Sequence, residues 1–530
     1  MKDLLIVFFL GLLLPFYSQK DSIVVTNQNI EIFSEFYDLL DKNYLDTINH
    51  DAFINHILKQ TASALDPYTR YFTKQETKDR NKSWSGISYA GIGASVNYIN
   101  QEVVIEHCKK GYGADSAGLM MGDVIVEIND SNVTELTLAN TIKLLKGPEG
   151  TSLSVKVKRG DTHHVFTILR KTIMVSSIAY SNLEQKEIGI IKINQFLRGS
   201  GLKFRLHVKE LLNKGAKRII IDLRGNRGGI LKECVSMLSV FLPINTLICE
   251  LKSKDLKSNY KKYTDKAPLD IKIPIVILVD KNTMSAAEIF AGAMQDLDRA
   301  VLIGNQTFGK GMVQGTRVLE NKSTLYVTAA RYHLPSGRCI QKKQTKSPLI
   351  NSSDKNFKTI FHTLNGRIVK GYNGVSPDLV IKPFEENHKI VNSISKSRLD
   401  FNFAVSVFRN PDFNLDEPLG FSKKEYQHFL LENIESINLK QELECLKILE
   451  ETPCSKWAIK RTKNEFNKRK RELIKIAIDD IYIKLKNLII YNSSYADGLY
   501  ESTIETDPYF NKAVQVISDS SSYHQLRNFQ

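Results

Sequence analysis

The segment from residue 275 to residue 314 constrains the fold of this chain more than any other. It opens with an apolar run, Ile275–Val279, which predicts a buried strand. The apolar residues that recur after Ser285 have helical spacing, and residues 300–304 predict a second strand. Lys310 follows between two glycines, where the backbone can turn tightly. A strand, a helix and another strand in this order predict an α/β fold.

Ser285 and Lys310 are a candidate nucleophile and base. Ser285 stands where a strand leads into a helix, so free N–H groups and the positive end of the helix dipole face whatever its hydroxyl attacks. A serine is a weak nucleophile until a neighbouring base takes its proton, and a lysine is a base only when it is neutral. An apolar setting lowers a lysine pKa, and Lys310 has apolar neighbours in Phe308, Met312 and Val313. Gln314 is placed to orient the amine.

A simpler interpretation makes Ser285 an ordinary helix N-cap and Lys310 a solvated loop lysine. For two isolated residues that interpretation would be preferred, and the complete spaced string argues against it. The string resembles the carboxy-terminal processing, or tail-specific, protease family. That family carries its serine in Ser-Ala-x-Glu-Ile, its lysine in Thr-Phe-Gly-Lys-Gly and a glutamine four residues later. These positions match Ser285, Lys310 and Gln314.

A second segment, residues 222–229, matches the family's Asp-Leu-Arg-x-Asn-x-Gly-Gly. By resemblance, the N–H groups of Gly229 (in preference to Gly228) and Ala286 form an oxyanion hole, which is a large contribution to acyl transfer. Taken alone, the two glycines are an ordinary turn after a strand. The chain departs from the family at two positions that supply none of this chemistry, with Ala287 in place of a frequent Ser and Arg227 in place of a frequent Pro.

Residues 84–172 resemble a PDZ domain. The ordered evidence is a loop near residue 91, a helix–turn–strand segment at residues 114–129, and a turn at residues 147–151 that leads into a strand. A PDZ domain adds an extended peptide to a sheet edge, and consecutive N–H groups capture the terminal carboxylate. The resemblance assigns that capture to the loop residues Ala90, Gly91, Ile92 and Gly93. A generic small β domain is the alternative.

Further divisions follow from the pattern along the chain. We expect a signal peptide at residues 1–18, a helical segment at 26–83, a protease core at 173–384 and a helical C-terminal extension at 385–530. The resemblance implies that the core has the superhelical ββα-repeat fold shared with ClpP and crotonase. The extension has no assigned chemistry; oligomerisation, shielding of the site, adaptor binding and packing on the core remain open for it.

Composition excludes several classes of protein. Of 530 residues, 42% are hydrophobic, which excludes wholesale disorder. The net charge of +15 comes from scattered lysines and one run, residues 456–475, which we interpret as a solvated helical face because no nucleic-acid motif accompanies it; contact with an anionic membrane surface is the alternative. The six cysteines lack metal-ligand spacing, and only Cys445 and Cys454 are candidates for a disulfide. We therefore expect neither a metal nor an organic cofactor, and no nucleic-acid partner.

The sequence predicts an exported serine endopeptidase of the periplasm or cell envelope. Its PDZ domain would bind protein or peptide substrates by their free C-termini, and Ser285 with Lys310 would cleave them. The apolar run at residues 4–15 is short for a membrane span, and Phe16 is bulky at a cleavage site, so an uncleaved membrane anchor stays open. A homo-oligomer or an adaptor is also possible. The alternatives are a catalytically silent PDZ adaptor on a protease-like scaffold and a crotonase-type acyl-CoA enzyme.

Overall fold

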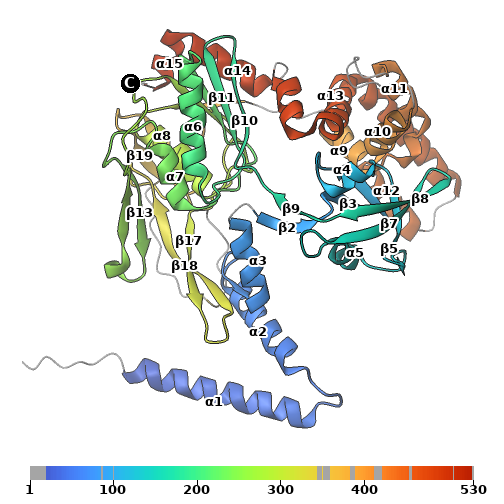
Figure 1. The fold of residues 1–530 in the computed structure, drawn as a ribbon, viewed down its shortest axis with the longest axis horizontal. Coiled ribbons are helices and arrows are strands. Elements are labelled where there is room, and N and C mark those ends of the chain that lie inside the picture. The colour runs from blue at the N-terminus through green and yellow to red at the C-terminus, as the bar shows by residue number, and fades with distance from the viewer. Residues whose placement is uncertain are drawn as a thin grey trace, which may run out of the picture.

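The computed structural model describes residues 20–84, 87–99, 101–342, 349, 359–381, 388–410, 421–452, 456–504 and 507–527. Figure 1 shows a large α/β unit beside a smaller unit rich in strands, with N-terminal helices below them and C-terminal helices along both. The predicted signal peptide lies outside the described residues. So does Cys454, the expected partner of Cys445.

The core is built on a six-stranded sheet in the order β10-β11-β12-β15-β16-β21. All neighbours are parallel except β10, which is antiparallel to β11. The strands are β10 (Ile178–Glu184), β11 (Ile188–Ile193), β12 (Arg218–Asp222), β15 (Ile275–Val279), β16 (Val301–Gly304) and β21 (Leu379–Val380). The central strands are buried on both faces, which explains their uninterrupted apolar runs.

Helices cover both faces of this sheet. One face packs against α6 (Ser200–Asn213), α7 (Leu231–Leu238) and α8 (Ala286–Asp296). The other face packs against two helices from the end of the chain, α14 (Pro508–Ser518) and α15 (Ser520–Arg527). Alternate residues of each strand belong to the two apolar clusters, as a pleated strand requires. The predicted α/β core is confirmed.

A second sheet has the order β1-β18-β13-β14, and β17 also pairs with β18. Its strands are β1 (Arg70–Phe72), β13 (Leu247–Ser253), β14 (Tyr260–Tyr263), β17 (Met312–Val318) and β18 (Thr324–His333). Strand β1 belongs to the N-terminal segment and pairs with β18. Strand β18 also pairs with β17, the strand that follows Lys310, so this sheet links the N-terminal segment to the region of Lys310. A separate hairpin joins β19 (Ile360–His362) to β20 (Ile368–Lys370).

The smaller unit, which the sequence predicts to be a PDZ domain, contains a sheet in the order β3-β4-β5-β7-β8, with the short β6 paired to β5. Its elements are β3 (Ala94–Ile99), β4 (Glu102–Cys108), α4 (Gly113–Ala117), β5 (Val124–Ile128), β6 (Ser131–Asn132), α5 (Leu138–Leu145), β7 (Ser152–Arg159) and β8 (Thr162–Leu169). The pair β2 (Ile87–Gly91) and β9 (Lys171–Met174) connects the domain to the core (Figure 1). Strand β3 lies at the edge of the larger sheet, where a peptide strand can be added.

The C-terminal extension packs on the PDZ domain as well as on the core. Its further helices are α9 (His388–Lys396), α10 (Leu399–Arg409), α11 (Lys423–Glu432), α12 (Lys440–Glu451) and α13 (Lys456–Ile504). Helices α9, α10, α11 and α13 share one apolar cluster with Val104 and Met121 of the predicted PDZ domain. The expectation of a solvated lysine run fails at Lys470, which is 1% exposed and donates to Glu442 at 3.0 Å. A buried charge needs such a partner.

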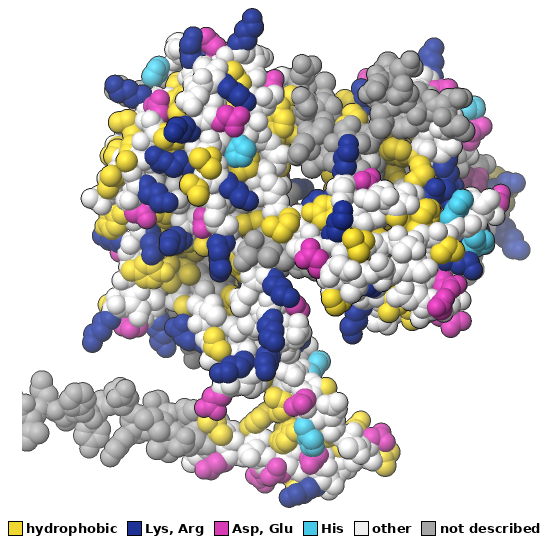
Figure 2. All heavy atoms as spheres, viewed as in Figure 1, with side chains coloured by type: hydrophobic (Ala, Val, Ile, Leu, Met, Phe, Trp, Pro, Cys, Tyr) yellow, Lys and Arg dark blue, Asp and Glu magenta, His cyan; other side chains and the backbone are white. Residues whose placement is uncertain are grey.

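The N-terminal segment forms α1 (Lys20–Asn43), α2 (His50–Leu65) and α3 (Lys74–Trp84). Helix α1 lies apart, below the rest of the molecule in Figure 1, and leaves Ile30, Phe33 and Phe36 exposed. Among the described residues, no helix is both long and apolar enough to span a membrane. Lysine and arginine side chains are spread over the face in Figure 2 and do not gather in one stripe.

Candidate active site

Ser285 occupies a strained position at the start of α8. It is the N-cap residue, with φ 58° and ψ −121°, an unusual conformation for a residue with a side chain. Gly228 lies directly against it. A Cβ atom on Gly228 would come within 2.6 Å of the Met284 carbonyl oxygen and 2.9 Å of the Ser285 Cβ. Only glycine therefore allows this approach of the 222–229 loop to the serine.

The Glu288 carboxylate holds the backbone of Ser285 and of Lys310 together. One oxygen, Oε2, accepts the N–H of Ser285 and the N–H of Lys310, each at 2.8 Å. The other, Oε1, accepts the Thr307 hydroxyl at 2.6 Å and the Gly309 N–H at 2.7 Å. The side chain is fully buried, and burial raises the pKa of Glu288 while these four donors oppose that rise.

Glu288 was missing from the residues expected to form the site. In the sequence Glu288 is the glutamate of the Ser-Ala-x-Glu-Ile segment, to which no role was assigned. A serine followed three residues later by glutamate is also a capping-box signal. That signal accounts for the bond to the Ser285 N–H. It gives no indication of the bonds to residues 307–310, which are far away in sequence.

Lys310 lies in a setting that lowers the pKa of its amine below that of an ordinary lysine. The Tyr68 ring, whose centre is 4.7 Å from Nζ, acts in the opposite direction because an aromatic face attracts the charged amine. Burial lowers the pKa of Lys310, and the positive charges of Arg80 and Arg70 lower it further, against opposing effects of Glu288 and Asp66. Tyr68, Arg70 and Arg80 come from the N-terminal segment, and sequence reasoning did not connect them with the site.

Two predicted relations of Lys310 are not hydrogen bonds in this structure. Glu288 bonds the backbone of both Ser285 and Lys310, but no hydrogen bond joins the Ser285 hydroxyl to the Lys310 amine. The Gln314 Nε2 donates to the Met312 carbonyl at 3.4 Å and to the Thr328 hydroxyl at 3.5 Å, and not to Lys310. The proton transfer and the orienting role of Gln314 therefore remain predictions.

The two N–H groups expected to form the oxyanion hole are available. Neither the Gly229 N–H nor the Ala286 N–H donates to another described residue. The Gly228 N–H, in contrast, donates to the Asn226 side chain at 2.8 Å, which favours Gly229 over Gly228 for this role. Gly229 has φ 150°, and a Cβ there would lie 2.2 Å from the Phe196 carbonyl oxygen. A Cβ on Gly228, the residue before Gly229, would lie 2.9 Å from the Ala286 nitrogen and 2.9 Å from the Ser285 Cβ.

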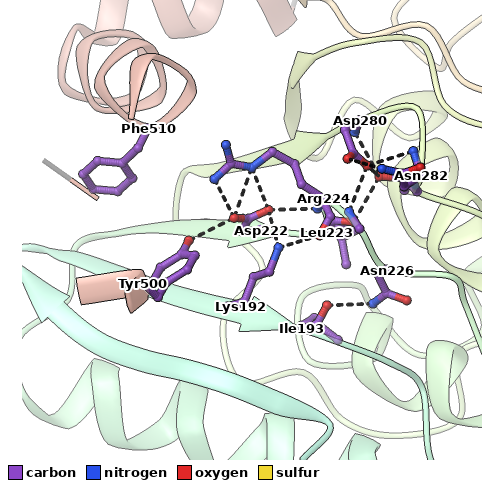
Figure 3. Close-up of polar contacts among 12 residues, drawn as sticks. Lys192, Ile193, Asp222, Leu223, Arg224, Asn226, Asp280, Asn282, Tyr500 and Phe510 are labelled. Carbon is purple, nitrogen blue, oxygen red and sulfur yellow. Dashed lines mark hydrogen bonds and ion pairs between the residues drawn. The ribbon is translucent and has the colours of Figure 1, made fainter. Parts of the chain in front are cut away.

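A cluster of buried charges supports the start of the same loop (Figure 3). Asp222, at the end of β12, forms ion pairs with the Arg224 guanidinium at 2.8 Å and with the Lys192 amine at 3.1 Å. Burial alone would raise the pKa of Asp222, but these two cations outweigh it and hold the pKa well below its usual range. The loop then continues through Asn226, whose side chain donates to the Ile193 carbonyl at 2.8 Å.

The predicted carboxylate loop of the PDZ domain precedes the edge strand β3. Ala90 and Gly91 end β2, and Ile92 is 2% exposed in the apolar core of the domain. The Ile92 and Gly93 carbonyls accept N–H groups from elsewhere in the domain, at 2.8 and 2.7 Å, whereas their own N–H groups bond no described residue. This leaves consecutive donors at the end of the strand to which a peptide would add.

Comparison with known proteins settles the family. Residues 187–348 match the family model of peptidase family S41, and residues 75–158 match that of the PDZ domain. A probable CtpA-like serine protease of Staphylococcus aureus is 31% identical over 357 residues, which cover 63% of this chain and 71% of the relative. The chain belongs to peptidase family S41. A similar protein of Staphylococcus saprophyticus is 28% identical over 418 residues, 75% of this chain and 80% of the relative.

Among solved structures, the photosystem II D1 C-terminal processing protease aligns with 66% of this S41 peptidase and 87% of its own chain, at 22% identity and a TM-score of 0.39. The predicted family, a serine-type C-terminal processing protease with a PDZ domain, is confirmed. Ser285 and Lys310 both lie within the residues matched by the S41 model. The helical extension that follows residue 384 lies outside both matched ranges.

Proposed function

We propose that this S41 peptidase is an exported endopeptidase that binds the free C-terminus of its substrate and cleaves the chain with a Ser285/Lys310 dyad. The main structural support for the dyad is the Glu288 carboxylate, which accepts the backbone N–H groups of both Ser285 and Lys310. Export is inferred from the apolar run at residues 4–15, and an uncleaved N-terminus would attach the enzyme to a membrane.

In the proposed reaction, neutral Lys310 takes the hydroxyl proton of Ser285 as the serine oxygen attacks a peptide carbonyl. The carbonyl oxygen gains negative charge and accepts the N–H groups of Gly229 and Ala286. When the tetrahedral intermediate collapses, the protonated amine of Lys310 gives its proton to the leaving nitrogen. Water then attacks the acyl-enzyme as Lys310 accepts its proton, and Lys310 returns that proton to the Ser285 oxygen when the acyl C–O bond breaks. Gln314 would orient the lysine amine during these transfers.

Titration of Lys310 should set the acid side of the pH–rate profile. The rate rises with pH as the neutral amine appears, and a lowered pKa places that rise below the pH of an ordinary lysine. Because Arg80 contributes to the lowering, Arg80→Gln should raise the pKa of Lys310 and move the acid limb of kcat/KM to higher pH. Lys82→Gln removes a charge from the same helix and is the matched control. An unmoved limb in Arg80→Gln would contradict this account of the base.

Capture of a substrate carboxylate should make tail binding depend on a free C-terminus. A peptide with an apolar free-acid tail should bind about tenfold more tightly than its amidated form, the scale of one lost charge-assisted hydrogen bond. Calorimetry on the full chain carrying Ser285→Ala measures both peptides without turnover. Equal affinities would rule out carboxylate capture by residues 90–93 and make the domain a reader of internal sequence.

The same experiments separate the alternatives. A silent adaptor would bind free-acid tails and never hydrolyse them. A crotonase-type enzyme would show neither property and would act on an acyl thioester. We favour the peptidase because the dyad, the loop at 222–229 and the PDZ domain occur together in one S41 chain.

A further inference from the structure

The C-terminal extension reaches the charge cluster below the oxyanion loop at two points. Near the end of α13, the Tyr500 hydroxyl donates to Asp222 at 3.0 Å (Figure 3). Just before α14, an Asp507 oxygen lies 2.6 Å from the Arg224 guanidinium. The Tyr509 ring lies beside the same guanidinium, 5.1 Å from its central carbon. These residues lie outside the S41-matched range, so the extension brings its own side chains to the core.

Asp507 balances the charge of the cluster. Lys192 and Arg224 carry two positive charges, and Asp222 alone supplies one negative charge. The side chains of Lys192 and Arg224 are 16% and 19% exposed and Asp222 is fully buried, so an unbalanced charge is poorly solvated here. With Asp507, which is 18% exposed, the four charges sum to zero.

The cluster is bonded to the loop that ends at Gly229. Lys192 donates to the backbone carbonyl of Arg224 at 2.5 Å, which ties the cation to the start of the loop. The next residue, Gly225, donates its N–H to Asp280 at 2.9 Å, and Asn226 accepts the Met284 N–H at 2.9 Å through its carbonyl. A shift of Arg224 would therefore move the loop relative to Ser285.

We propose that Asp507 and Tyr500 are positioning residues for the reaction, which hold Arg224 and Asp222 so that the Gly229 N–H keeps its place beside Ser285. The inference rests on the proposed function, since it assigns a use to the proposed oxyanion donor. On this proposal the C-terminal extension contributes to kcat and does not contribute to substrate binding.

Two substitutions at Asp507 separate positioning from helix capping. Its Oδ1 also accepts the N–H groups of Tyr509 and Phe510 as the N-cap of α14. Asparagine is as good an N-cap as aspartate but carries no charge, whereas glutamate keeps the charge and is a poorer cap. If Asp507 acts by positioning, the variant that keeps the charge, Asp507→Glu, should keep its activity. If Asp507 acts only as a helix cap, the activity of each variant should change in proportion to its stability.

The test measures kcat, KM and Tm of the full chain with a free-acid peptide substrate. We expect Asp507→Asn to lower kcat by about tenfold with KM nearly unchanged, and the uncompensated charge on Arg224 should also lower Tm. Asp507→Glu should retain most of the kcat at a lower Tm. Tyr500→Phe, which removes only the hydroxyl, should lower kcat by about threefold. The matched control is Asp519→Asn, at the N-terminal end of α15, where the side chain bonds only nearby residues and all three values should stay at wild type.

Wild-type kcat in Asp507→Asn, or a kcat that follows Tm across both Asp507 variants, would overturn the inference. Neither result would affect the proposed function. Loss of that function would show instead as a wild-type chain with no hydrolysis beyond that of Ser285→Ala.

Discussion

Replacing Ser285 or Lys310 by alanine is expected to lower kcat for peptide hydrolysis by about 10⁴-fold or more while the chain stays folded. The serine supplies the attacking oxygen and the lysine accepts its proton, so neither group works without the other. For the same reason the double variant should be no worse than either single variant. Turnover of a free-acid peptide, followed by mass spectrometry of the products, measures all three.

A folding control is built into this comparison. Thermal unfolding should be close to wild type for Ser285→Ala, because the bonds of Glu288 go to the backbone N–H groups of residues 285 and 310 and not to their side chains. Substantial turnover by a folded Lys310→Ala chain would exclude Lys310 as the base. Gln314→Ala should have a smaller effect than either, since its expected role is to orient the amine.

Glu288→Gln should cause the second largest loss, in both activity and stability. An amide keeps one accepting oxygen, but its NH₂ group would face two of the four donors that the carboxylate now accepts. Leaving buried donors unpaired should lower the free energy of unfolding by about 3 kcal/mol. The backbone of Ser285 and Lys310 would separate, and a misplacement on that scale should lower kcat by about 100-fold.

Denaturant unfolding and steady-state kinetics on Glu288→Gln test both parts of this expectation. Glu320→Gln, on an exposed turn, removes the same charge away from the site and should leave both measurements unchanged. If Glu288→Gln lost stability but kept wild-type kcat below its unfolding transition, the carboxylate would be a structural cap without a part in positioning the dyad.

Much of the core could be predicted from local sequence, because buried strands and amphipathic helices have characteristic spacings of apolar residues. The strand at residues 275–279 has the predicted bounds, and α8 begins at the residue after Ser285 as expected. The family segments also placed Gly229 and Ala286 next to the serine, and the Gly228 contact agrees with this.

The parts of the site that were missed depend on contacts between distant segments. The Tyr68 ring beside Lys310 is more than two hundred residues earlier in the chain, and Asp507 approaches Arg224 from the last helices. Single polar side chains in such contacts have no spacing pattern that would reveal them. The solvated interpretation of residues 456–475 failed at Lys470 for the same reason, since its partner Glu442 lies on another helix.

Covalent labelling of the nucleophile tests the central claim most directly. A fluorophosphonate probe reacts with a serine whose hydroxyl is activated by a base, and peptide mapping of the labelled chain identifies the residue. The account predicts one adduct, on Ser285, in the wild-type chain and little or none in a folded Lys310→Ala chain. An adduct on another residue, or equal labelling of Ser285 with and without the Lys310 amine, would contradict it.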